Sequence, residues 1–257
     1  LKINTQPLST ILSRIFTEII QEFNWPKSMY WGDNYSLRWV RPLRSITAVL
    51  FENEKRERVP LHVRDIESDI VTRAHHVMHP EFFDFKSIND YREKIANGKV
   101  ILQPQDRKKI IVQEGKKLAK ARGFYVIEDD KLLEEIVGLT EFPVPLVGKI
   151  PEELLSIPEE VIISSMREHQ KFLSLRSSTN GKVEGFLVIT DLETHDQQKT
   201  ILSGNMRVLN SRLKDAMFFY QNDLDLVKNH GMMAWNDKLK SVRFHEKLGS
   251  QYNRVER

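Results

Sequence analysis

One stretch of this chain, residues 204–223, constrains the fold more than any other, because it has the pattern of a single long helix with two different sides. Its apolar residues recur at three- and four-residue steps, the spacing of one helix face, and its basic residues lie off that stripe. The pattern predicts a helix that packs on a core and faces an acidic partner. The stripe consists of Val208, Leu209, Leu213, Ala216, Phe219 and Tyr220, and the basic side of Arg207, Arg212 and Lys214.

The composition is that of an ordinary globular protein, with 40% hydrophobic and 29% charged residues among 257. This length allows one large domain or two smaller ones. No apolar run approaches the roughly 20 residues that a membrane helix needs, and no secretory signal is visible. Because the chain has no cysteine, disulfides, a thiol nucleophile and thiolate-bound zinc are excluded, which suits the cytoplasm. It begins at Leu and ends within a charged helical pattern, from which we expect an excised part of a longer polypeptide.

Helical and strand patterns alternate irregularly, which predicts an α+β fold with a mixed or antiparallel sheet and packed helices. Pro143 and Pro145 predict an edge or bulged position for their strand, and Asn180-Gly181 predicts a hairpin turn. Ser87 and Asp130 are the expected caps of two helices, with Asn97-Gly98 as a left-handed terminus. The expected helices are 8–23, 87–96, 106–121, 131–139 and 158–169, and the expected strands are 43–51, 59–63, 70–75, 124–127, 142–148, 172–175 and 186–190.

Three parts are expected along the chain. An N-terminal helix occupies 1–26, an α+β domain 27–224, and a linker with the start of a helical domain 225–257. The break is placed near Asn229-His230-Gly231, because Gly interrupts the helical pattern there. The first helix of the last part is expected from Val242 onward.

Two groups of residues invite a catalytic or metal interpretation, which we do not adopt. His75, His76 and His79 lack an acidic base between them, and Pro80 argues against a helix that would align them. The residue types of a hydrolytic set are present, but such a set is defined by geometry, so a helix cap and surface polar residues are expected. No glycine-rich phosphate loop is visible. We therefore predict neither catalytic residues nor a metal site. The hydrolytic residue types are Ser164, Ser165, His169 and Asp191.

Basic residues gather in three clusters. The first interleaves three guanidinium groups with Trp39, which suits phosphate pairing and base stacking. The alternative is that Trp39 lies in the core and the arginines form ordinary ion pairs, and chemistry alone does not separate the two. For each of the other clusters alone, a solvated face is expected. The clusters are Arg38, Arg41 and Arg44; Arg167, His169 and Lys171; and Arg207, Arg212 and Lys214.

Motifs in chain order from Met29 to the C-terminus resemble the β subunit of the bacterial two-subunit glycyl-tRNA synthetase. Ala74 stands where that family usually has Gly, Phe142 where it has Trp, and His76 where it has Arg, so Arg73 and His75 are better contact candidates than His76. The motifs are Met29-Tyr30-Trp31-Gly32, Arg41-Pro42, Thr72-Arg73-Ala74-His75, Glu141-Phe142-Pro143-Val144, Met166 to Phe172, Ser203-Gly204-Asn205, Arg207-Val208, Arg212-Leu213, Asp215-Ala216, Phe218-Phe219 and Glu246-Lys247-Leu248-Gly249.

The resemblance implies a subunit of an enzyme that ligates glycine to tRNA(Gly) with ATP and Mg, in which a separate α subunit of an α2β2 tetramer holds the class II active site. It implies the α subunit and tRNA(Gly) as partners, no DNA and no membrane, and no cofactor bound by this chain. It also implies a fold similar to the editing-type module of the phenylalanyl-tRNA synthetase β chain, followed by a helical segment of HD type. The residues expected to contact tRNA or the subunit interface are Arg38, Arg41, Arg44, Arg73, His75, Arg167, His169, Lys171, Arg207 and Arg212.

Three roles stay open at this point. The first is contact with tRNA combined with organisation of the subunits. The second is a hydrolytic editing pocket for mischarged tRNA, which rests on analogy of fold, although a site for glycine excludes larger amino acids easily. The third is a structural module that holds the α subunit to the anticodon-reading part of the β subunit without touching RNA.

Overall fold

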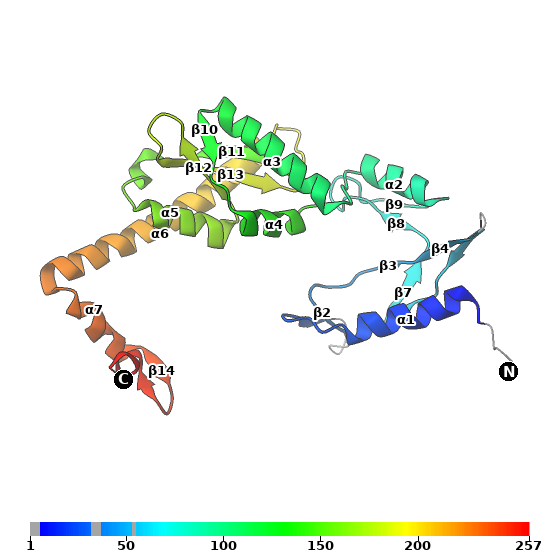
Figure 1. Ribbon diagram of the computed structural model, residues 1–257, viewed down its shortest axis with the longest axis horizontal. Helices are drawn as coiled ribbons and strands as arrows, with labels where there is room; N and C mark the ends of the chain where they lie inside the picture. Colours follow the sequence, from blue (N-terminus) through cyan, green and yellow to red (C-terminus); the bar gives the residue numbers. More distant parts are fainter. Residues whose placement is uncertain (1–5, 32–36, 53–54, 257) are drawn as a thin grey trace. The chain divides into compact units, whose positions relative to one another are not determined.

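The computed structural model describes residues 6–31, 37–52 and 55–256. The chain divides into two compact units, Leu1–Gln103 and Pro104–Arg257. Both contain helices and short sheets, so the predicted α+β class is confirmed (Figure 1). The division lies inside the range 27–224 that the sequence analysis gave to one domain, and the functional boundaries stay a prediction. Within the described ranges, no helix has the length and apolar character needed to cross a bilayer.

The first unit contains one parallel and several antiparallel strand pairs. Ala48 lies between a strand of the parallel pair and a strand of an antiparallel pair. Strand β3 pairs parallel with β7, while β4 pairs antiparallel with β5. The expected strand 43–51 is divided at this residue, because its N–H donates to Asp69 and its carbonyl accepts from Val59. The elements of this unit are α1 (Leu8–Glu22), β1 (Met29–Trp31), β2 (Leu37–Trp39), β3 (Ile46–Thr47), β4 (Val49–Glu52), β5 (Lys55–Arg58), β6 (His62–Val63), β7 (Ile66–Asp69), β8 (Thr72–Arg73), β9 (Phe82–Phe83) and α2 (Ile88–Asn97).

Helix α1 has the bounds expected from its periodicity but packs through its polar side. Ser9 is buried, and the Ser13 hydroxyl donates to the carbonyl of Pro60 beside β6. Most of the apolar stripe of the same helix is exposed, while Ile11, Leu12 and Ile20 are half-buried; such exposure is unusual for a helix with so regular a hydrophobic pattern. Its exposed members are Leu8, Ile15, Phe16, Ile19 and, just after the helix, Phe23.

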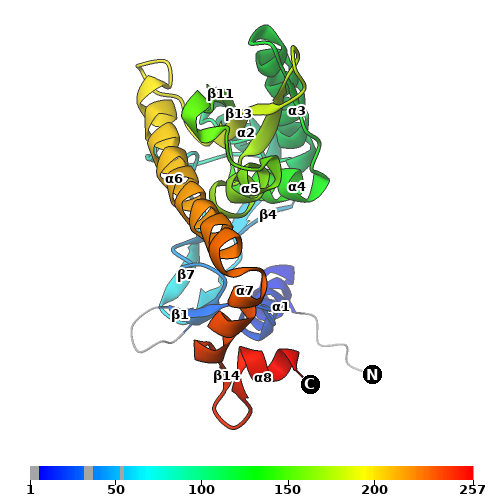
Figure 2. The same cartoon turned by 90° about the vertical axis from the view of Figure 1, so that its left-hand side faces the viewer.

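The second unit is a four-stranded antiparallel sheet between two helical layers. Its strand order is β10-β12-β13-β11, so the proline-containing strand β11 lies at an edge, as predicted. Helices α3 and α4 cover one face and α5 and α6 the other (Figure 2). The elements are α3 (Pro104–Ala121), β10 (Phe124–Val126), α4 (Asp130–Leu139), β11 (Val144–Lys149), the 3-10 helix η2 (Glu152–Leu154), α5 (Glu159–Ser165), the π-helix η3 (Met166–Gln170), β12 (Leu173–Ser177), β13 (Val183–Thr190), α6 (Lys199–His230), α7 (Met233–Lys238), the 3-10 helix η4 (Leu239–Ser241), β14 (Arg243–His245), β15 (Gly249–Ser250) and α8 (Gln251–Val255).

Strand β13 supplies both cores of this unit. Its successive side chains point to opposite faces of the sheet. Phe186 and Val188 enter the core beneath α5 and α6, where Phe186 stacks on Phe172 with ring centroids 4.9 Å apart. Leu187, between them in the sequence, enters the core beneath α3 and α4. Because this strand is central, it fixes the position of all four helices.

Three expected helix ends differ from the observed ones. Asp129 rather than Asp130 caps α4, because its carboxylate accepts the N–H of Leu132. After α2 the left-handed residue is Lys99 rather than Gly98. Gly98 instead allows close packing, since a Cβ there would lie 2.1 Å from that of Ala74. The helix expected over 158–169 begins as α5 but continues as a π-helix.

The segment after α6 also departs from expectation. The helix ends at His230 and the chain turns at Gly231, whose φ is 75°, so the predicted interruption of the helix is confirmed, while the domain boundary placed there stays a prediction. The prediction of a helix from Val242 onward is wrong, because β14 and β15 form an antiparallel pair there. Only then does Ser250 start α8, through a capping box with Asn253.

The packing between β11 and β13 yields a test of the fold. A Cβ at Gly148 would lie 2.2 Å from the ring of Phe186, which is fully buried and held by its stack on Phe172. We expect Gly148→Ala to lower the free energy of unfolding by about 1–3 kcal/mol. Gly138→Ala in α4 meets nothing within 4 Å and should be neutral or stabilise by up to about 1 kcal/mol. Urea denaturation of both variants measures the difference, and equal midpoints would contradict the assigned register.

Candidate functional site

The predicted basic side of helix α6 is exposed to solvent. Leu209 and Leu213 are fully buried against the sheet layer, as expected. Two other members of the predicted stripe do not pack, since Val208 is 44% and Phe219 is 64% exposed. The residues that do pack lie on a neighbouring side of the helix. They are Leu202, Met206 and Met217, together with the two buried leucines.

The exposed side of α6 combines cations with aromatic rings. Arg207 and Lys214 are seven residues apart and so lie on one side of the helix, with Phe218 one turn beyond. Arg212 shares its side with Phe219 in the same way. All three cations are exposed, and within the described part of the chain they form no ion pair. Among the described residues, the helix therefore presents three cations that are not held in ion pairs, with Asp215 as the acidic residue nearest to them in sequence.

The second basic cluster is used differently. Arg167 pairs with Asp129 at 2.8 Å, and Lys171 pairs with Glu135 at 3.0 Å. Both acidic partners belong to the start or body of α4, so these cations join η3 to α4 and their charge is already balanced. His169, between them, is exposed. The structure brings these three residues onto one π-helical turn and the loop residue that follows it.

The first basic cluster, Arg38, Arg41 and Arg44 around Trp39, fits neither of its two interpretations completely. Trp39 is half-buried and its ring meets that of Trp25 edge-on, at a centroid distance of 5.0 Å. Arg38 donates from Nε to the Ser28 hydroxyl at 2.7 Å. Arg41 and Arg44 are exposed, and no ion pair involves them among the residues described. Trp39 thus packs locally, while two of the arginines remain open to solvent.

Arg73 and His75 lie in and after the short strand β8. The guanidinium of Arg73 lies over the ring of Phe82, 5.7 Å from its centroid. His75 is fully buried, and its Nδ1 accepts the N–H groups of Val77 and Met78 at 3.3 and 3.2 Å. Its imidazole holds this turn, so a direct contact between His75 and a partner requires the turn to open. Arg73 is half-buried and reaches solvent more readily.

The four residues considered as a hydrolytic set, Ser164, Ser165, His169 and Asp191, lie in different local environments. The carboxylate of Asp191 accepts the backbone N–H groups of Glu141 and Phe142 at 2.6 and 2.8 Å, which fixes the chain at the start of β11. Ser164 and Ser165 end α5, and His169 lies on η3. Ser164 and His169 are exposed, as expected for surface polar residues, whereas Ser165 makes no capping hydrogen bond through its side chain at the start of η3.

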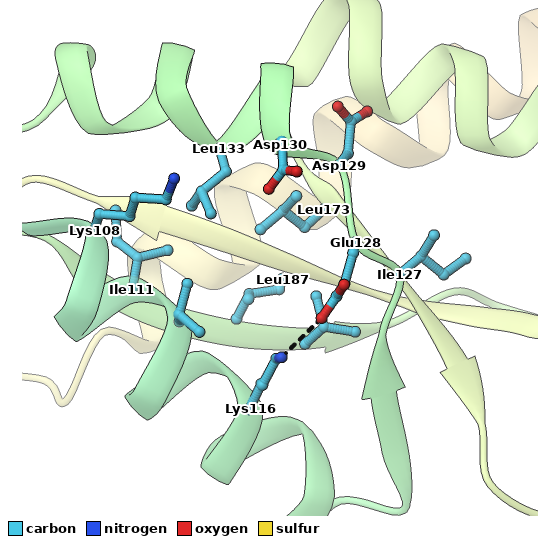
Figure 3. Close-up of a pocket in the computed structure, with 12 residues that line it drawn as sticks. Lys108, Ile111, Lys116, Ile127, Glu128, Asp129, Asp130, Leu133, Leu173 and Leu187 are labelled. Carbon is cyan, nitrogen blue, oxygen red and sulfur yellow. Dashed lines mark hydrogen bonds and ion pairs between the residues drawn. The ribbon is translucent and has the colours of Figure 1, made fainter. Parts of the chain in front are cut away.

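A cavity of about 190 Å³ lies between α3, α4 and the sheet (Figure 3). Its floor is apolar and includes Leu173 and Leu187. Sequence analysis missed it, because its walls come from segments far apart in the chain and no single motif marks them. Its charged lining residues are Lys108, Lys116, Glu128, Asp129 and Asp130.

Four of the five charged residues that line this cavity have an ion-pair partner: Lys116 and Glu128 pair with each other, Lys108 with Glu134, and Asp129 with Arg167. Lys116 binds Glu128 at 2.9 Å, and this hydrogen bond lowers the pKa of the glutamate. Lys108 binds Glu134 at 2.5 Å; that hydrogen bond, and more weakly the charge of Asp130, raise the pKa of the lysine. Lys108 therefore remains protonated at neutral pH.

The double role of Asp129 yields a second test. Asp129→Ala removes both the cap of α4 and the ion pair with Arg167, and should cost about 1–2 kcal/mol of unfolding free energy. Asp129→Asn keeps a good cap and loses only the partly exposed ion pair, so its cost should stay below about 1 kcal/mol. Chemical denaturation ranks the two variants against Asp130→Ala, whose side chain caps nothing. An alanine variant as stable as the asparagine variant would show that the cap contributes little.

Comparison with known proteins agrees with the resemblance described above. The family model for the glycyl-tRNA synthetase beta subunit matches residues 1–257. The chain is 44% identical over 252 residues to the glycine–tRNA ligase beta subunit of Paracoccus denitrificans, covering 98% of this chain and 36% of that protein. It is 36% identical over 256 residues to that of Rickettsia bellii, covering 100% of this chain and 37% of the relative. The chain thus spans a little over a third of the length of these relatives.

Proposed function

The chain belongs to the glycyl-tRNA synthetase β-subunit family, and we propose that it contacts tRNA(Gly) and organises the subunits of that ligase. In this proposal an α subunit carries the aminoacylation site, where glycine is activated with ATP and Mg before transfer to the tRNA. The present chain contributes binding rather than chemistry. It works in the cytoplasm as part of an α2β2 enzyme.

The observation that carries the RNA-binding part of the proposal is the open basic side of α6. Arg207, Arg212 and Lys214 are exposed and have no acidic partner in the described part of the chain. Cations held at regular spacing on a rigid helix suit a phosphate backbone, and the exposed rings of Phe218 and Phe219 suit stacking on unpaired bases. Arg41 and Arg44 offer a further open pair in the first unit. The Arg167 cluster is a weaker candidate, because Asp129 and Glu135 already balance its cations.

The exposed apolar stripe of α1 supports the organising part of the proposal. A contiguous exposed apolar face on a helix is typical of an interface with another protein. In this chain the opposite, polar side of α1 provides the packing, through Ser9 and Ser13. We propose that the α subunit covers the stripe in the complete ligase.

Charge reversal on α6 tests the RNA contact. In the complete α–β enzyme, the double variant R207E/K214E should bind tRNA(Gly) at least about tenfold more weakly, because two charge-assisted contacts become repulsive. The plot of log affinity against log salt should become less steep by about 1 to 2 units. Fluorescence titration with labelled tRNA across a salt series measures both quantities.

A control matched in charge is K149E/K182E, which changes two exposed lysines, Lys149 at the end of β11 and Lys182 in the turn just before β13. It should leave the salt slope unchanged. If both double variants lose affinity equally, the effect is one of net charge and α6 is not a specific contact. If R207E/K214E keeps the affinity and slope of the unmodified enzyme, the proposed contact is wrong.

Charge placed in the α1 stripe tests the subunit contact. Ile15→Glu combined with Ile19→Glu should weaken association of the α and β subunits by roughly tenfold or more, because a carboxylate would be buried at the interface. The control is Glu18→Gln on the same helix, which should have little effect. Analytical ultracentrifugation gives the association constants. Unchanged association together with a lower melting temperature of the isolated β subunit would show that the β polypeptide itself covers the stripe.

A further inference from the structure

The hairpin of β14 and β15 carries the sequence motif Glu246-Lys247-Leu248-Gly249, which the proposed contact through α6 does not explain. Gly249 has a φ of 89°, and a Cβ there would lie 2.7 Å from Oδ1 of Asn253, so this position requires glycine. The Nδ1 atom of His245 accepts the N–H of Lys247 at 3.1 Å. The tip of the hairpin is therefore held in a defined conformation, although its residues are exposed.

The segment around this hairpin is ordered without a core of its own. None of the described residues 231–256 is buried. Two contacts between a cation and a ring help to join its elements. The guanidinium of Arg254 in α8 lies 4.7 Å from the ring centroid of Phe244 in β14, and the ammonium of Lys240 in η4 lies 4.7 Å from that of Tyr252 in α8. Because the rings are only partly covered, with Phe244 39% exposed, the segment displays cations and aromatic surface together.

The charge of this segment is positive and only partly balanced. Lys240 is held by Asp237 at 2.7 Å. Arg243, Lys247 and Arg254 are exposed and form no ion pair among the described residues. These three cations are therefore available to an anionic partner. Residues 238–256 contain five basic residues against two glutamates: Lys238, Lys240, Arg243, Lys247 and Arg254, against Glu246 and Glu256.

The exposed ring indicates which kind of anion fits. A cation beside a ring meets both groups that single-stranded RNA presents, because the cation pairs with a phosphate and the ring stacks on an unpaired base. In a duplex the bases are already stacked on one another, so the ring of Phe244 would stay unused. An acidic peptide would pair with the cations but offers no base to the ring.

We propose that the β14–β15 hairpin and α8 bind an unpaired, single-stranded stretch of RNA, with Arg243 and Lys247 at the phosphates and a base stacked on Phe244 beside Arg254. This inference rests on the proposed contact with tRNA and adds to it the kind of RNA structure that is bound. The surface is distinct from the basic side of α6, so the two contacts can be tested separately.

Fluorescence anisotropy of this chain with a labelled oligouridine of about twelve nucleotides, a length within known single-strand site sizes, tests the proposal. We expect a dissociation constant on the order of 10 μM at low salt. Phe244→Leu, which keeps an apolar side chain against Arg254, should weaken binding about fivefold or more, because the stacking of one base is lost. The matched control is Tyr125→Leu, which removes a ring of similar exposure, 49%, on β10, and should have no effect.

Removal of charge at the hairpin gives a second measurement, which remains decisive if Phe244→Leu disturbs α8. The double variant R243Q/K247Q should weaken oligouridine binding about fivefold or more and make the plot of log affinity against log salt less steep by about 1 unit. The control K149Q/K182Q, at two other exposed lysines, should leave both quantities unchanged.

An RNA duplex and an oligoglutamate peptide of the same length are the comparison ligands. Phe244→Leu should weaken the binding of oligouridine and leave that of the duplex and the peptide unchanged. No binding of oligouridine at low salt, unchanged binding in either hairpin variant, or an equal loss for the duplex or the peptide in Phe244→Leu would each overturn the inference. If the hairpin variants bind oligouridine normally while R207E/K214E weakens tRNA binding by the complete enzyme, this inference is wrong and the proposed function stands.

Discussion

The alternation of side chains along β13 is the constraint on which the second unit depends. Phe186 and Leu187 are neighbours in the chain but belong to different cores, one beneath α5 and α6 and the other beneath α3 and α4. A shift of this strand by one residue would exchange the two cores and place Phe186 against the wrong helices. Gly148 opposite Phe186 leaves the room that this register needs. The basic side of α6 and the cavity under α3 are both positioned by this single strand.

Much of this unit was predictable because its signals are local. The Asn180-Gly181 turn marked the hairpin of β12 and β13, and two prolines marked β11 as an edge strand. The α6 stripe was predicted correctly at Leu209 and Leu213 but not at Phe219. Packing on one side of a helix requires only part of a broad apolar pattern. Figure 1 shows α6 continuing past the sheet, and in this part of the helix Phe218, Phe219 and Leu224 are exposed. Periodicity identifies the helix without deciding which of its apolar residues are used.

The functional residues were less predictable, because pairing depends on contacts between distant segments. Arg167 and Arg207 look alike in the sequence, as basic residues in helical surroundings. Only the structure shows that Arg167 meets Asp129, while Arg207 has no such partner in the described chain. His75 was predicted to contact a partner, but it is buried, and its Nδ1 accepts a backbone N–H of the turn that follows it. The cavity lay beyond sequence reasoning altogether, since its rim combines α3 residues with the loop before α4.

The two layers of helices separate two kinds of surface that one face could not combine easily. A phosphate-binding face needs cations without nearby carboxylates, since acidic neighbours would neutralise them and repel RNA. The α3–α4 layer has the opposite character, because Glu128, Asp129 and Asp130 gather at the start of α4 and two lysines of α3 are paired with acidic residues, Lys116 with Glu128 and Lys108 with Glu134. A sheet buried on both faces keeps these surfaces apart by the thickness of the unit. The proposed tRNA contact through α6 therefore does not depend on the charges at the start of α4, and substitutions in one surface leave the other unchanged.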